Sequence, residues 1–130
     1  PAVSGQVGLG LCPPGWLDVE RTCRRRGYHR NVMGELMELI HGQYDAKPEG
    51  FVPGGASLHN MMSAHGPDAG AYENATAAEL KPQFLGATMA FMFETRYPIK
   101  LTDWAANSPQ MQAGYQDCWQ DLQKNFTGKP

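Results

Sequence analysis

The clearest alternation of apolar and polar positions lies in residues 88–95. Successive side chains there would point to opposite faces of an extended chain, with Met89, Phe91 and Phe93 on one face and Ala90, Met92 and Glu94 on the other. A period of two residues is typical of a β-strand, so this segment is predicted to be one. A second, shorter strand is predicted over residues 6–11, ending at the turn that Pro13 and Pro14 indicate.

Residues 32–40 fit two kinds of element. Their larger side chains can share one face of a helix, whereas residues 35–41 can equally form a buried strand. Gly42 is expected to end the element in either case. Between positions 47 and 70 the many glycines and prolines indicate a region dominated by turns.

Two helices are predicted toward the C-terminus. One covers residues 74–81 and ends before Pro82. The other covers residues 114–126, where apolar side chains recur at helical spacing: Tyr115, Cys118, Trp119, Leu122 and Phe126. The whole pattern therefore predicts a mostly β domain with one or two peripheral helices, the last of them amphipathic.

Composition limits the classes of partner. The 130 residues suffice for one ordinary domain, and 42% hydrophobic with 18% charged residues permits a packed core. A net charge of −2 argues against nucleic acid or an anionic membrane as partner, and no apolar run approaches the roughly 20 residues of a membrane span. A cluster of arginines between positions 21 and 30 is interpreted as a solvated loop or a subunit contact.

The cysteines indicate the redox compartment of the protein, and the first residue indicates how the chain was produced. Cys12, Cys23 and Cys118 are odd in number and widely spaced, which favours reduced thiols in a cytoplasmic protein. The chain begins with Pro1, and its first methionine is Met33. We therefore expect either a processed protein or a piece of a longer chain.

The candidate chemistry lies among the histidines. All four of them, His29, His41, His59 and His65, fall between positions 29 and 65, together with Glu35. Core histidines are commonly structural, but four of them close to a carboxylate among turns favour a metal site. Two imidazoles and one carboxylate suit either iron(II) with open positions or catalytic zinc.

The spacing of His29 and Glu35 restricts the geometry of such a site. A separation of six residues turns two side chains about 120° apart on a helix. On one straight strand the same two side chains would lie roughly 20 Å apart. The chain between His29 and Glu35 must therefore bend if both bind one ion.

Motifs along nearly the whole chain resemble one family. They include Tyr28-His29-Arg30-Asn31, Gly50-Phe51, Pro53-Gly54-Gly55, Ser57-Leu58-His59-Asn60, His65-Gly66-Pro67-Asp68 and the strand at residues 89–94. In order and spacing they are similar to the C-terminal third of the homogentisate 1,2-dioxygenase family, with the similarity extending from about Cys12 to Phe126. The resemblance implies a cupin-like jelly-roll barrel, present here in part, with a C-terminal helix and an Fe(II) cofactor.

The resemblance also implies roles for individual residues. His29, Glu35 and His65 match the three iron ligands of the family, and His65 also lies on the substrate side. Tyr44 matches a substrate-contacting tyrosine, and His59 matches a histidine that lines the active site and takes part in catalysis. By the same comparison, His41 is expected to be structural, and Glu38 receives no role.

The sequence departs from the family pattern in two respects. Arg25, Arg26 and Gly27 stand where the family tends to have prolines, which could alter a loop or a subunit contact. The family's acid–base histidine and most of its N-terminal domain lie upstream of the matching segment. The resemblance therefore implies that residues 1–130 are the C-terminal part of the catalytic domain and are inactive alone.

The activity implied for the whole enzyme is the opening of the ring of homogentisate by O₂. The product is maleylacetoacetate, in tyrosine and phenylalanine breakdown, and the family forms homo-oligomers in which trimers pair into hexamers. Two other functions fit the same residues. One is a non-catalytic cupin-type domain that binds a metal or another ligand, and the other is a zinc hydrolase that uses the same three ligands.

Overall fold

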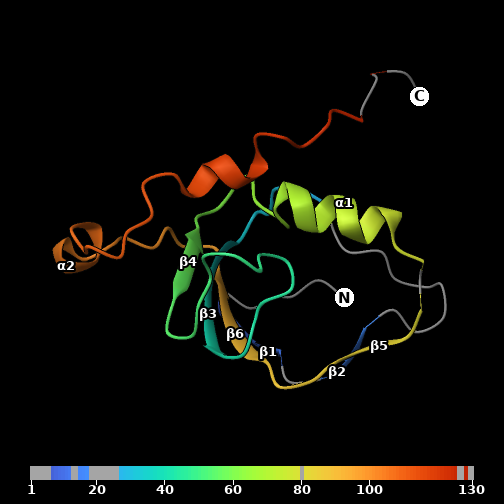
Figure 1. Ribbon diagram of the computed structural model, residues 1–130. Coiled ribbons are helices and arrows are strands. Elements are labelled where there is room, and N and C mark those ends of the chain that lie inside the picture. The colour runs from blue at the N-terminus through green and yellow to red at the C-terminus, as the bar shows by residue number, and fades with distance from the viewer. Residues whose placement is uncertain (1–6, 13–14, 18–26, 80, 126–127, 129–130) are drawn as a thin grey trace.

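The computed structural model describes residues 7–12, 15–17, 27–79, 81–125 and 128 (Figure 1). The predictions for the turn at residues 13–14, the arginines at residues 21–26 and the helix end at Phe126 lie outside these residues. The largest element of regular structure is a four-stranded antiparallel sheet in the order β1-β6-β3-β4. Its strands are β1 (Val7–Cys12), β6 (Met89–Thr95), β3 (Gly34–His41) and β4 (Ala56–His59).

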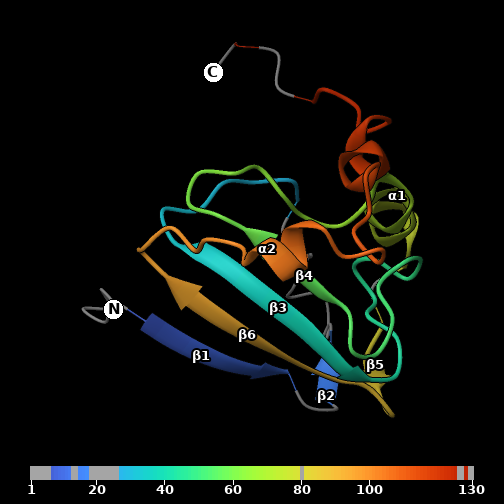
Figure 2. The same ribbon diagram turned by 90° about the vertical axis from the view of Figure 1, so that its left-hand side faces the viewer.

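Smaller elements surround this sheet. A two-stranded antiparallel sheet pairs β2 (Gly15–Leu17) with β5 (Gln83–Leu85), and Figure 2 shows it at one end of the four longer strands. The helical elements are α1 (Ala69–Ala77), α2 (Asp103–Ala106) and the 3₁₀ helix η1 (Tyr115–Trp119). In Figure 1, α1 and the segment of η1 lie side by side above the strands, whereas α2 extends away from them.

The strand predictions are confirmed, and the ambiguous segment is resolved. The alternating residues form β6, and the early strand is β1. The segment that fitted either a helix or a strand is the central strand β3, although its Met, Leu and Glu residues favour helices in isolation. Because β3 pairs with β6 on one side and with β4 on the other, sheet pairing outweighs local propensity.

Gly42 ends β3 for a steric reason. Its φ is +83°, and a Cβ at this position would lie 2.2 Å from the carbonyl oxygen of Ala87. A residue with a Cβ could not adopt this backbone conformation so close to the segment at Ala87. The prediction that Gly42 ends the element is therefore confirmed.

The alternation along β3 determines which residues face the core. Side chains two residues apart point to the same face of a strand, so Glu35, Met37 and Leu39 share one face. Leu39 packs with Phe51 and Ala90 in the buried cluster, and Met37 and Tyr44 pack against it: Leu39 has no exposed surface at all. Glu35 thus points to the same side of the sheet as the hydrophobic core.

The helix predicted over residues 74–81 is wrong in its boundaries. Helix α1 begins at Ala69, and Asp68 is its N-cap, with the side-chain carboxylate accepting a 2.7 Å hydrogen bond from the backbone N–H of Ala71. The sequence Gly66-Pro67-Asp68 suggested only a turn, but an aspartate that follows a turn is also a preferred N-cap. The helix ends at Ala77.

The C-terminal helix predicted over residues 114–126 is also wrong in its extent. Of the described residues 114–125, only 115–119 are helical, and they form the short 3₁₀ helix η1. Tyr, Asp, Cys and Trp have modest helix propensities, and the first residue of η1 has no side-chain cap. The apolar spacing reflected the burial of particular side chains, above all Trp119, rather than a continuous helix.

The predicted fold class agrees with this architecture. Among the described residues more belong to strands than to helices, and the antiparallel sheet is consistent with part of a cupin-like barrel. Within the described residues the sheet is not closed into a barrel. Among the same residues, no helix has the length and apolar character needed to span a membrane.

Candidate metal centre

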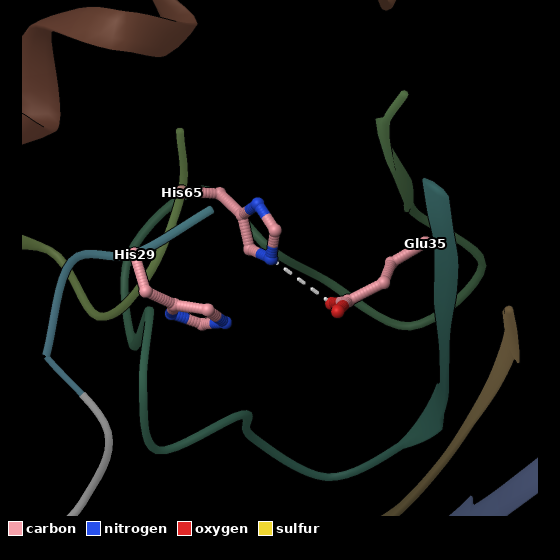
Figure 3. A group of neighbouring side chains, drawn as sticks. All are labelled: His29, Glu35 and His65. Atoms are coloured by element: carbon pink, nitrogen blue, oxygen red, sulfur yellow. Dashed lines mark hydrogen bonds and ion pairs between the residues drawn. The ribbon is translucent and has the colours of Figure 1, made fainter. Parts of the chain in front are cut away.

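Two of the predicted ligands, His29 and His65, are joined through their backbones. The N–H of His29 donates to the carbonyl of His65 at 2.8 Å, and the N–H of His65 donates to the carbonyl of His29 at 2.9 Å. This isolated antiparallel bridge holds the two imidazole rings with their centroids 4.6 Å apart (Figure 3). His29 and His65 are 36 positions apart in the sequence, and this bridge therefore brings their rings together.

Backbone carbonyls also set the proton positions of both rings. Nδ1 of His29 lies 2.9 Å from the carbonyl oxygen of Gly27, and Nδ1 of His65 lies 2.9 Å from that of Ser63. A carbonyl oxygen can only accept a hydrogen bond, so each Nδ1 carries a proton. In the neutral imidazoles each Nε2 therefore keeps its lone pair, which is the usual arrangement of metal-binding histidines.

Glu35 completes the group from the beginning of β3. Its Oε2 lies 3.1 Å from Nε2 of His65, as the dashed line in Figure 3 marks. One ligand atom from each of His29, Glu35 and His65 lies within 4.8 Å of the other two. Atoms that each lie about 2.1 Å from one ion can be at most about 4.2 Å apart, so only a small movement would place all three around an ion.

The donor set fits a divalent metal ion. With the Nδ1 proton directed at the carbonyl of Ser63, Nε2 of His65 faces Oε2 of Glu35 at 3.1 Å. Two acceptors at this distance repel each other unless a proton or a metal cation lies between them. The side chains of His65 and Glu35 are only 6% and 14% exposed, which strengthens this electrostatic requirement. Two imidazoles with one carboxylate suit iron(II) or zinc.

The bend required between His29 and Glu35 is present. His29 lies outside β3, in the bridge to His65, whereas Glu35 is the second residue of the strand. Between them the chain turns at Asn31, whose side-chain oxygen accepts a 3.2 Å hydrogen bond from the backbone N–H of Met33. Neither a helix nor one straight strand is involved, in agreement with the geometric argument from the spacing.

His59 lies beside the three candidate ligands. It is the last residue of β4 and stands opposite Glu35 in the β3–β4 register. Its ring stacks on that of His65, with centroids 4.5 Å apart and planes 5° from parallel. Burial, reinforced by the neighbouring His65, lowers the pKa of His59 to about 4, so its imidazole is neutral at pH 7.

The C-terminal segment supplies two residues that the sequence did not identify as part of the site. The hydroxyl of Tyr115 forms a 2.8 Å hydrogen bond with Nε2 of His59, and burial raises the pKa of this hydroxyl. The indole N–H of Trp119 donates to the carbonyl of Gly66 at 3.0 Å, directly after His65. We call Tyr115 and Trp119 the aromatic cover of the histidines.

Further contacts fix the cover and the end of β4. The ammonium group of Lys47 lies 4.9 Å from the centre of the Tyr115 ring, within the range of a cation–π interaction. Asn60, which follows His59, pairs both amide atoms with the backbone of Ile99, at 2.9 and 2.8 Å. The apolar spacing of residues 115–126 indicated burial of Tyr115 and Trp119, but no signal in the sequence indicated the partners of their polar atoms.

The remaining candidates do not belong to the three-ligand group. The ring of Tyr44 packs edge-on against Phe51 at the core, 5.6 Å between centroids, and its contact with a substrate stays a prediction. His41 is exposed at the far end of β3, and Glu38 points to the opposite face of that strand from Glu35. Of the four histidines, the structure brings His29, His59 and His65 together and separates His41 from them.

Comparison with known proteins connects this geometry to one family. A family model described as homogentisate 1,2-dioxygenase C-terminal matches residues 3–126. The chain is 58% identical over 129 residues to a homogentisate 1,2-dioxygenase of Rhizobium etli (strain CIAT 652), and 54% identical over 134 residues to one of Rhizobium meliloti (strain 1021). These alignments cover 99% of the chain but only 28% and 30% of the two relatives. The family match and the relatives agree, and the chain belongs to the homogentisate 1,2-dioxygenase family.

Proposed function

We propose that the intact protein carrying this chain is an iron(II)-dependent dioxygenase that opens the ring of homogentisate. It would convert homogentisate and O₂ to maleylacetoacetate in the breakdown of tyrosine and phenylalanine, with His29, Glu35 and His65 binding the iron. The observation that carries the proposal is the convergence of these three ligand atoms within 4.8 Å, in a chain of this family.

Iron(II) bound by two neutral imidazoles and one carboxylate would supply a single net positive charge and open positions where a phenolate and O₂ can react together. The side chains on this chain would fix where that happens. Both Nδ1–H groups donate to backbone carbonyls, so the rings of His29 and His65 cannot rotate without losing a hydrogen bond. The protein thus presents its ligand atoms already oriented.

His59 and Tyr44 would act on the organic substrate. His59 is neutral and stacked on His65, a position from which it can exchange a hydrogen bond with a ring hydroxyl of the substrate. Tyr44 would orient the substrate through its hydroxyl, and His65 would also contact it. Proton transfer in the full reaction would need an acid–base histidine from outside residues 1–130, and we expect the isolated segment to be inactive.

Assembly and location belong to the same proposal. We infer a homo-oligomer in which trimers pair into hexamers, and a cytoplasmic location. Within the described residues, several large apolar side chains are exposed, including Leu9 on β1 and Phe93 on β6. Such surface is consistent with contacts to other parts of the protein or to neighbouring subunits.

The test is oxygen uptake by the intact protein. We expect uptake that requires both Fe(II) and homogentisate and yields maleylacetoacetate. Turnover with zinc and without oxygen would instead support a hydrolase. Metal binding without turnover of homogentisate would support a non-catalytic binding domain, and either result would overturn the proposal.

A further inference from the structure

We propose that Asn31 is a positioning residue for Glu35. Its carboxamide fixes one carboxylate oxygen of Glu35 so that only the other oxygen faces the metal site. The proposal rests on the metal site proposed above. It concerns Asn31, a residue of the bend between His29 and Glu35 that does not itself belong to the group of candidate ligands.

The two oxygens of Glu35 have different partners. Oε1 accepts a 3.1 Å hydrogen bond from the side-chain nitrogen of Asn31, whereas Oε2 lies 3.1 Å from Nε2 of His65. Oε2 is therefore the oxygen directed toward the other ligands. A carboxylate with one oxygen engaged in this way is prepared to bind a metal through the second oxygen alone.

The orientation of the Asn31 carboxamide is itself determined. Its Oδ1 accepts from the backbone N–H of Met33 at 3.2 Å, and a backbone N–H can only donate. The NH₂ end must therefore point to Glu35, because the oxygen is already assigned. Asn31 thus combines two functions in one side chain: its oxygen forms the turn, and its nitrogen binds the carboxylate.

The backbone of Asn31 is anchored to the segment that orients His65. Its carbonyl accepts from the N–H of Met62 at 2.8 Å. Met62 precedes Ser63, whose carbonyl accepts the Nδ1 proton of His65. Asn31, which orients Glu35, is therefore connected through one hydrogen bond and one peptide bond to Ser63, which orients His65.

This arrangement has a consequence for the chemistry. One oxygen from Glu35 and one nitrogen from each histidine would occupy three positions around the ion and leave the others for substrate and O₂. A carboxylate that bound through both oxygens would occupy one position more. Partners that orient a metal ligand typically change metal affinity by about 10- to 100-fold when they are removed.

The test uses Asn31→Ser and Asn31→Ala in the intact protein. Serine keeps a side-chain oxygen that can accept from Met33 N–H, but it lacks the carboxamide NH₂, and its hydroxyl is one bond shorter than the group that reaches Glu35. Alanine lacks both groups. The dissociation constant for Fe(II) is measured anaerobically by competition with a chelator. We expect Asn31→Ser to weaken binding by roughly 10- to 100-fold, as Asn31→Ala does, and to keep the thermal unfolding midpoint of the metal-free protein near the wild-type value.

The control is Asn107→Ser. The side-chain nitrogen of Asn107 also donates to an oxygen, the backbone carbonyl of Asp103, but this contact is exposed and lies at the C-cap of α2. This variant should bind Fe(II) like the wild type. If serine at position 31 restores wild-type affinity, or if both position-31 variants fail to fold, Asn31 only forms the turn and the proposal is overturned. If the Glu35→Ala variant binds Fe(II) as tightly as the wild type, the proposed metal site is overturned instead.

Discussion

The metal-ligand group and the aromatic cover lie against each other but are built in different ways. His29, Glu35 and His65 come from one continuous stretch of the chain, and backbone hydrogen bonds join two of them directly. Tyr115 and Trp119 come from a segment at least 50 positions further along the chain and reach the site through side-chain atoms alone. Two members of the metal-ligand group are thus joined through the backbone, whereas the cover is held by side-chain hydrogen bonds, a cation–π contact and ring contacts.

This difference separates two kinds of sensitivity. Changes in the ligand group should affect metal binding directly, because its atoms would contact the ion. Changes in the cover should affect stability first, because its contacts are packing and hydrogen bonds. The variants below, all made in the intact protein, test this separation from the largest expected effect to the smallest.

Glu35→Ala should have the largest effect. It removes the only carboxylate of the group and leaves two imidazoles. We expect metal affinity to fall by more than the roughly 100-fold upper value for the loss of an orienting partner, so that purified protein contains almost no iron. Elemental analysis measures this, and iron content equal to that of the wild type would remove Glu35 from the ligand set.

Trp119→Ala should be the most destabilising change in the cover. Trp119 is 8% exposed and packs near Tyr28, Tyr115 and His59. Truncation of a buried tryptophan typically costs about 3–5 kcal/mol, which denaturant unfolding can measure. Trp119→Phe is the matched control, since it keeps an aromatic ring and loses mainly the hydrogen bond to Gly66, worth about 0.5–1.5 kcal/mol. Equal losses in the two variants would show that packing is not the main contribution of Trp119.

Tyr115→Phe should have a smaller effect, because only one hydroxyl is lost. The hydrogen bond to His59 disappears while the ring stays beside Trp119, so we expect a loss of about 0.5–1.5 kcal/mol in unfolding free energy and unchanged iron content. Tyr97→Phe, at a half-exposed position outside the site, is the control. A loss of iron comparable to that in Glu35→Ala would contradict the separation between ligand group and cover.

His41→Ala should change least. His41 is exposed at the end of β3, so we expect stability within about 0.5 kcal/mol of wild type and full iron content. This variant shows whether the histidines differ as their positions indicate. Iron loss in His41→Ala would mean that the set of ligands has been assigned wrongly.

The sequence predicted the local parts of this molecule better than the distant ones. The alternation in β6 and the stop at Gly42 depend on neighbouring residues and were correct. Residues 32–40 could not be resolved, because the strand conformation of β3 depends on hydrogen bonds to β4 and β6 that a local pattern does not contain. The limits of the two helices were wrong because the N-cap Asp68 and the side-chain partners of η1 were not recognised.

The candidate site shows the same limit. The residue types and spacing of His29 and Glu35 predicted a metal site with a bend, and family resemblance selected His65 over His41 as its third member. The sequence did not indicate that Asn31 forms the bend or that Tyr115 contacts His59, because both facts depend on the directions of single polar atoms. Such directions are determined by the packed backbone rather than by residue type.

The bridge between His29 and His65 also determines how the site can open. Each of these residues donates its amide proton to the other, so separating the two histidines breaks both hydrogen bonds and exposes both amide protons to solvent. The two histidines would therefore separate in a single local opening event rather than one after the other. The amide protons of His29 and His65 should then show similar protection against deuterium uptake, and that protection would measure the free energy of the local opening.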